Sequence, residues 1–112
     1  MKSVHENSKQ TLREEKDNLS RREKEVLGVL HQSFNGMTDR EVMKALGYSD
    51  MNAVRPRITE LVQKHWAKEV GNVSDPVTGK KVRQVKAIPA WERAKILEQI
   101  EEEKRNPQLS LL

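Results

Sequence analysis

Two short segments constrain the fold of this chain more than any other feature, because each is typical of the first turn of an α-helix. In Ser20–Glu23 and in Thr38–Glu41, a hydroxyl residue precedes a glutamate by three positions. In such a capping box the hydroxyl accepts a hydrogen bond from the third amide of the helix, and the carboxylate accepts one from the cap amide. The sequence therefore predicts two helices that begin close together along the chain.

The apolar residues after each box recur at helical spacing. For the first helix they are Val26, Leu27, Leu30 and Phe34, and Asn35-Gly36 is expected to end it, since glycine tolerates positive φ. For the second they are Val42, Met43 and Leu46, with Met37 and Val42 in the positions of a hydrophobic staple and Gly47 as the stop.

A third helix is predicted after Asp50, which can cap its first amides. Pro56 falls past the first turn of that helix, so we expect it to remove one backbone hydrogen bond and bend the axis. The inward-facing residues of this helix are Val54, Ile58, Leu61, Val62 and His65.

The second half of the chain reads as a β-hairpin and a last helix. Residues 66–73 and 80–88 look like strands, and the turn-forming cluster 74–79 joins them. Pro89 ends the hairpin, and Ala90–Arg105 has a helical pattern with a broad apolar arc. We expect this helix to pack on its own domain, with pairing to a second copy as the open alternative. The expected class is mainly α with a small β-hairpin.

The expected organisation has four parts. Residues 1–18 form a polar tail, 19–88 one domain, 89–105 the C-terminal helix and 106–112 a flexible tail. The chain has 112 residues, of which 34% are charged and 35% hydrophobic, so one modest core is expected.

The basic charge is concentrated in one segment. The net charge is +4, and residues 51–88 alone hold eight Lys/Arg and three Asp/Glu. A localised basic segment suits a nucleic-acid surface, and it equally suits a solvated face that keeps the protein soluble. Cysteine is absent, and no apolar run approaches the ~20 residues of a membrane span. We therefore expect a protein of the cytoplasm, bacterial or of a phage-infected host, without membrane attachment.

Three helices followed by a basic hairpin resemble a winged helix-turn-helix domain. Thr38–Gly47 resembles the second helix of that family, and Asn52–Leu61 resembles its recognition helix. The Arg-Pro-Arg step within Asn52–Leu61 is similar to that of small winged-helix proteins of phages and mobile elements. The resemblance covers about residues 20–88 and implies binding to duplex DNA.

The residue types on the predicted recognition helix suit base edges in the major groove. Asn52, Arg55, Thr59 and Gln63 fall on one face, with Pro56 among them, and Arg57 and Lys64 are predicted to flank it and suit phosphates. In the predicted wing, Lys80, Lys81 and Arg83 could reach the DNA backbone or the minor groove. Because winged helices also serve in protein–protein contacts, and because Pro56 lies on the presumed face, a protein-only adaptor is the alternative.

The last five residues resemble the peptide by which bacterial and phage proteins bind the sliding clamp of the replicative polymerase. Gln108, Leu109, Ser110, Leu111 and Leu112 match its Gln-Leu-Ser/Asp-Leu-Phe/Leu pattern. The resemblance implies that Gln108 enters a polar subsite and that Leu111 and Leu112 act as apolar anchors.

No pattern for catalysis is found. The histidines His5, His31 and His65 have no partner at ligand spacing, and there is no nucleophile constellation or Gly-rich phosphate loop, so we expect neither an enzyme nor a metal or cofactor. Three hypotheses remain. The protein is a replication-associated DNA-binding factor that also binds the clamp, a transcription regulator whose tail is incidental, or a protein-only adaptor.

Overall fold

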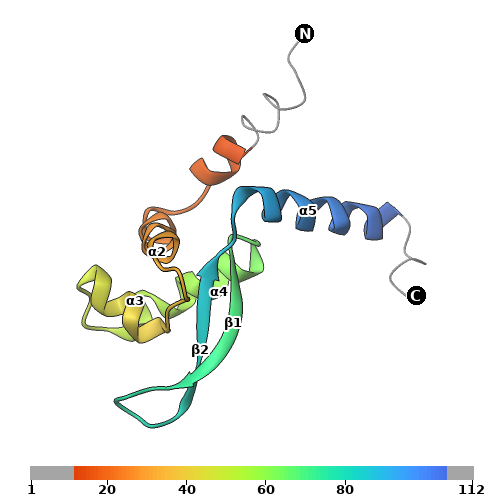
Figure 1. Cartoon of the computed structure of the whole chain (residues 1–112). Coiled ribbons are helices and arrows are strands. Elements are labelled where there is room, and N and C mark those ends of the chain that lie inside the picture. The colour runs from red at the N-terminus through yellow and green to blue at the C-terminus, as the bar shows by residue number, and fades with distance from the viewer. Residues whose placement is uncertain (1–11, 106–112) are drawn as a thin grey trace.

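The computed structural model describes residues 12–105 (Figure 1). Residues 12–17 are helical and precede the main elements. In order along the chain, these are the helices α2 (Arg21–Gln32) and α3 (Asp39–Leu46), the 3₁₀ turn η1 (Met51–Ala53), α4 (Arg55–Gln63), the strands β1 (Ala67–Ser74) and β2 (Lys81–Ala87), and α5 (Ala90–Arg105). The chain is mainly helical with one antiparallel hairpin, as predicted.

Both capping boxes are present. The Ser20 amide donates to Glu23 Oε1 over 2.8 Å, and the Glu23 amide donates back to Ser20 Oγ over 3.1 Å. Thr38 and Glu41 make the same pair of bonds over 2.9 and 3.2 Å. These local bonds satisfy amides that a helix start otherwise leaves unpaired. The predicted starts of α2 and α3 are therefore confirmed.

The first helix ends earlier than predicted. α2 ends at Gln32, where the Ser33 amide still donates to Leu30 O and Ser33 Oγ accepts from the Gly36 amide over 3.1 Å. This turn leaves Phe34 88% exposed instead of in the core. Gly36 then has φ +96, which favours glycine, and its absent side chain leaves room for Val70.

Pro56 begins a helix instead of bending one. Asp50 caps η1 through a 2.9 Å bond from the Asn52 amide, and Val54 separates η1 from α4. Because α4 starts at Arg55, Pro56 lies in its first turn. The amide that proline lacks has no intrahelical partner at that position, so the expected kink does not arise.

The core lies where α2, α3 and α4 pack together beside the hairpin. Each helix contributes one apolar side, and Val85 of β2 completes the cluster with Trp66 and Ala67 at the start of β1. The most deeply buried side chains are Leu27, Leu30, Ile58, Leu61, Val26, Val42, Val54 and Val85. Burial of this kind is the main favourable contribution to folding.

A backbone bridge joins the hairpin to the connection between α2 and α3. β1 and β2 pair from Ala67↔Ala87 to Ser74↔Lys81, with an irregularity between Glu69 and Gly71. Between α2 and α3, Met37 forms a bridge to Val85 through two backbone hydrogen bonds of 2.9 and 2.8 Å. In the α2–α3 connection, Met37 alone therefore pairs with β2, as a single residue of a third strand would.

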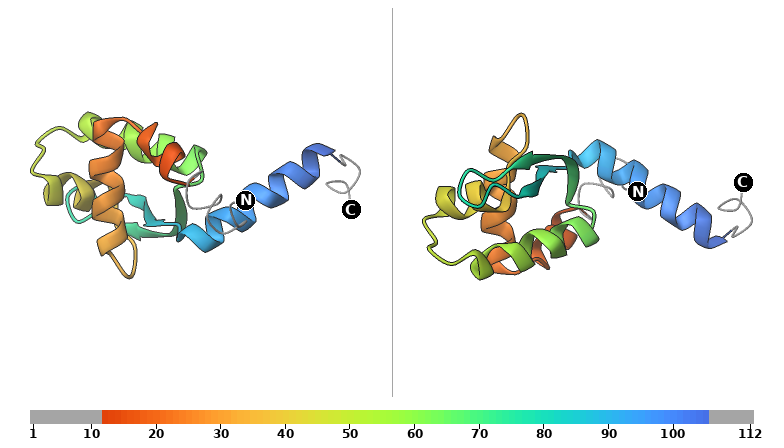
Figure 2. Two further views of the ribbon diagram at one scale, coloured as in Figure 1. Left: turned by 90° about the horizontal axis from the view of Figure 1, so that it is seen from above. Right: turned by 90° about the horizontal axis from the view of Figure 1, so that it is seen from below.

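α5 is anchored only near its start. The Arg93 guanidinium lies 3.8 Å from the centre of the Trp66 ring, donates to Lys64 O over 3.1 Å and pairs with Glu15. Arg93 is the only buried residue along α5, and Trp91 is 65% exposed. Beyond this anchor the helix leads away from the domain (Figures 1 and 2). The expected packing of its apolar arc onto the domain is therefore wrong.

Candidate nucleic-acid interface

A cleft of about 360 Å³ lies where the hairpin meets the N-terminal ends of α3 and α4. It brings together three of the residues predicted to contact DNA, Arg55, Thr59 and Arg83, although they come from α4 and β2. The remaining lining residues are Asp39, Arg40, Met51, Asp75 and Val82.

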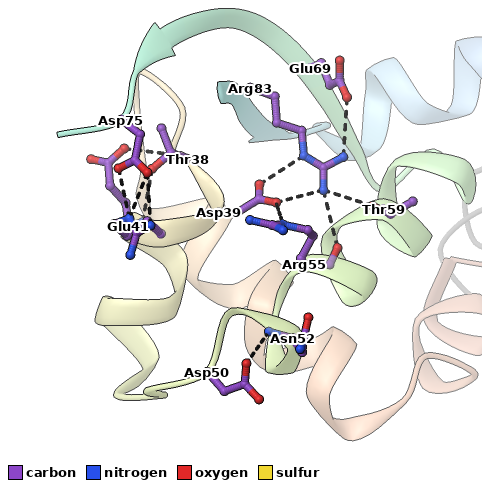
Figure 3. Close-up of polar contacts among 11 residues, drawn as sticks. Thr38, Asp39, Glu41, Asp50, Asn52, Arg55, Thr59, Glu69, Asp75 and Arg83 are labelled. Carbon is purple, nitrogen blue, oxygen red and sulfur yellow. Dashed lines mark hydrogen bonds and ion pairs between the residues drawn. The ribbon is translucent and has the colours of Figure 1, made fainter. Parts of the chain in front are cut away.

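Arg83 is the residue that joins the walls of this cleft (Figure 3). Its guanidinium donates to both carboxylate oxygens of Asp39, each over 3.1 Å, and to Thr59 Oγ1 over 3.0 Å. Longer contacts reach Arg55 O at 3.4 Å and Glu69 Oε1 at 3.5 Å. The side chain is 20% exposed. A planar guanidinium bound this way ties β2 to both α3 and α4.

A second arginine–aspartate pair holds the hairpin loop. Arg40 of α3 donates to Asp75 through Nε over 3.0 Å and through Nη2 over 3.1 Å. Asp75 also accepts from the Val77 amide and from the Thr78 hydroxyl. The hydrogen bond from Arg40 outweighs the effect of burial and lowers the pKa of Asp75. The loop is thereby fixed against the first turn of α3.

The predicted reading edge is exposed. Asn52, Arg55 and Gln63 are exposed and Thr59 is half-buried beneath Arg83. Arg55, Thr59 and Gln63 follow one another at four-residue intervals along α4, so they share one face. Arg55 lies 3.6 Å from Asp39 with its side chain 58% exposed, and its guanidinium can therefore turn outward.

The hairpin adds two unpaired cations to this surface. Lys80 and Lys81 are exposed and form no ion pair with any residue in the range 12–105. Arg83, by contrast, is paired with Asp39, which makes it the least available of the three cations predicted for the wing. The net positive charge that faces outward here therefore comes from the two lysines and Arg55.

Arg57 and Lys64 do not flank the reading edge as predicted. Lys64 pairs with Glu23 of α2 over 2.7 Å, and Arg57 lines a different cleft with residues of α2. The two residues are seven positions apart, so they share the side of α4 that faces α2. Burial would raise the pKa of Glu23, but the hydrogen bonds from Lys64 and Ser20 outweigh it and lower the pKa.

Three charged residues of this cleft, Asp39, Arg40 and Asp75, were not predicted from the sequence. An acidic residue in the first turn of a helix, such as Asp39, is usual because it complements the helix dipole, so it gave no sign of a distant partner. Its partner Arg83 lies 44 positions away, and Asp75 lies 35 positions from Arg40. Only the docking of the hairpin brings these charges together.

No helix in the described part of the chain is long and apolar enough to cross a membrane. Within residues 12–105 no group of three His, Asp or Glu side chains is placed to hold a metal ion. The clamp-like peptide, residues 108–112, lies outside the described residues.

The sequence matches no model of a known protein family, and no curated protein matches it significantly.

Proposed function

We propose that residues 19–88 are a winged helix-turn-helix domain that binds duplex DNA. The observation that carries the proposal is the shared surface of α4 and the hairpin. The exposed polar edge of η1 and α4 lies beside the hairpin, in which Lys80 and Lys81, at the start of β2, have no ion-pair partner within residues 12–105. The bridge between Met37 and Val85 supports the fold assignment, because it places the hairpin against the α2–α3 connection.

In this proposal α4 enters the major groove with its N-terminal end leading. Asn52 and Arg55 are the residue types that pair with adenine and guanine edges, and Gln63 extends the same face. Lys80 and Lys81 neutralise phosphates beside the groove. Arg83 keeps the hairpin at a set angle to α4, so that helix and lysines reach one duplex together. Pro56, in the first turn, leaves the α4 hydrogen-bond ladder intact.

A salt titration on random duplex DNA tests the proposal. Because each neutralised phosphate releases counterions, log K should fall linearly with log salt, with a slope of about 0.9 per contact. Replacing Lys80 and Lys81 together by glutamine should lower the slope by about 2. The matched control is Lys44→Gln with Lys24→Gln, which removes two exposed charges from elsewhere on the helices. Equal slopes for the two double variants, or no binding at low salt, would refute the proposal.

A protein-only adaptor is the second candidate, and the exposed aromatic residues favour it. Phe34 is 88% and Trp91 65% exposed, and apart from the ammonium groups of Lys86 and Lys95 that lie over the two rings, their faces are open to a protein partner. Asp39 and Asp75 also neutralise part of the basic surface. The adaptor function predicts that duplex DNA does not bind at low salt, while Phe34→Ala weakens capture of a protein partner.

We propose clamp binding through residues 108–112 as a separable activity. A clamp ligand joined to a DNA-binding domain suits a replication-associated factor, because each contact raises the local concentration for the other. Deleting residues 108–112 should abolish binding to a purified sliding clamp and leave duplex affinity unchanged. If the intact chain does not bind the clamp, the remaining function is that of a transcription regulator.

Pairing of two copies through residues 90–105 is part of the same proposal. Ile96, Leu97 and Ile100 stay partly exposed on the segment of α5 that leads away from the domain. Sedimentation of the full chain over a range of concentrations tests this, with Leu97→Glu as the variant expected to remain monomeric. A wild-type chain that stays monomeric at all concentrations would refute it.

A further inference from the structure

A second cleft, of about 470 Å³, opens between the N-terminal end of α2 and the first turns of α4. Arg21 and Arg22 come from α2, and Arg57 comes from α4. Its other lining residues are Ser20, Glu25 and Tyr48. We call it the arginine cleft. The reading edge of α4 contributes no residue to it.

Arg21 and Arg22 are only weakly neutralised, whereas Arg57 pairs with Glu60. Arg22 lies over the Tyr48 ring, 4.9 Å from its centre, and forms no ion pair with any other residue that the structure describes. Arg21 pairs with Glu25 at 3.5 Å while its side chain is 95% exposed, so water and salt screen that pair. The remaining carboxylate oxygen of Glu25 accepts from the Tyr48 hydroxyl over 2.7 Å.

Arg57 has a donor without an acceptor. Its Nη2 donates to Glu60 over 2.7 Å, but its Nε is buried and has no hydrogen-bond partner among the described residues. Buried donors are nearly always paired. Arg93 Nε is a second buried and unpaired guanidinium nitrogen among the described residues, but of the two arginines only Arg57 lines the arginine cleft. An oxyanion that drew this side chain into the arginine cleft would supply the acceptor.

The position of the arginine cleft relates it to the proposed DNA surface. α4 has the hairpin on one side and α2 on the other (Figure 3). A helix in the major groove lies between two phosphate backbones, one along each edge of the groove. Lys80 and Lys81 can contact the backbone on the hairpin side of α4, and the arginine cleft lies on the α2 side.

We propose that the arginine cleft binds a phosphate of the same duplex, on the strand opposite the one that the hairpin lysines contact. The inference rests on the proposed function, since it adds a second phosphate site to that interface. Arg22 is the principal contact, and Arg57 gains a partner for its Nε when the phosphate binds. Recognition is by charge and guanidinium geometry, so it is independent of base sequence.

The test compares Arg22→Gln with Lys24→Gln, in the full chain, by salt-titrated binding to random duplex DNA. Both changes remove one exposed charge from α2, but Lys24 lines a different cleft beside residues 16 and 17. We expect Arg22→Gln to lower the salt slope by about 1 and Lys24→Gln to change it far less. Arg57→Gln should act in the same direction. Should that variant fold poorly, Arg22→Gln still decides, because Arg22 forms no ion pair within residues 12–105.

The two proposals fail in different ways. If wild type binds DNA and Lys81→Gln lowers the slope while Arg22→Gln matches Lys24→Gln, the arginine cleft is not a phosphate site and the DNA-binding proposal stands. If wild type does not bind duplex DNA at low salt, both proposals are overturned. Preservation of the circular dichroism spectrum in each variant shows that the slopes compare folded proteins.

Discussion

Arg83→Lys is the variant that most directly tests how the hairpin is held. The substitution keeps the net charge of the chain but replaces the planar guanidinium, which has several N–H donors, by a single ammonium group. A lysine can retain one bond to Asp39, so the second bond to that carboxylate and the bond to Thr59, of 3.1 and 3.0 Å, are lost. A hydrogen bond to a charged group contributes about 1.5–3 kcal/mol. Because the side chain is 20% exposed, we take the lower end and expect a loss of about 2–3 kcal/mol.

Urea unfolding followed by circular dichroism measures this loss. With the denaturant dependence usual for a small domain, about 1–3 kcal/mol per molar urea, the midpoint should fall by about 0.7–3 M. Lys81→Gln is the control from the same strand, since Lys81 is exposed and unpaired in the described residues, and it should change stability by less than about 0.5 kcal/mol. If Arg83→Lys is no more destabilising than this control, Arg83 does not hold the hairpin and the account of the cleft is wrong.

Three further predictions concern the rest of the domain. Because Arg40 lowers the pKa of Asp75, the carboxylate stabilises the fold at neutral pH, and this stabilisation is lost as the pH falls below about 4. Asp75→Asn should therefore flatten the fall of Tm in acid, and an unchanged profile would contradict the pairing. Ile58→Ala, at a fully buried position, should cost about 2–5 kcal/mol in urea unfolding, and a loss below 1 kcal/mol would mean that α4 does not pack as described. Ser20→Ala and Thr38→Ala should each cost about 1 kcal/mol and add in the double variant, since the caps belong to separate helices.

The sequence was sufficient to predict a structural element wherever the interaction that forms it is local. Each capping box joins residues three positions apart. Gly47 ends α3 with φ +78, and this end is predictable because glycine itself tolerates a positive φ. The hairpin was predictable for the same reason, because a turn cluster between two strand-like runs encodes its own pairing. The start of α5 at Ala90 was also predicted correctly from Pro89 before it.

Predictions failed where two rules competed locally. The apolar spacing extended the first helix to Phe34, but the Ser33 side chain closes a turn with Gly36 and ends the helix earlier. The spacing likewise suggested one continuous helix after Asp50, whereas a 3₁₀ turn comes first and shifts Pro56 to the beginning of α4. Periodicity alone does not say which of these local hydrogen bonds forms.

The tertiary structure alone decided which charges meet. Whether Arg83 is a free cation or the partner of Asp39 depends on how the hairpin docks, and whether Lys64 faces DNA or Glu23 depends on the rotation of α4 against α2. The docking of the hairpin and the rotation of α4 are both set by the packing of Ile58, Leu61 and Val85 in the core, and this packing determines where the charged side chains lie. The sequence specifies where each helix begins because those bonds close within one turn, but ion pairs across the fold have no sequence spacing to reveal them.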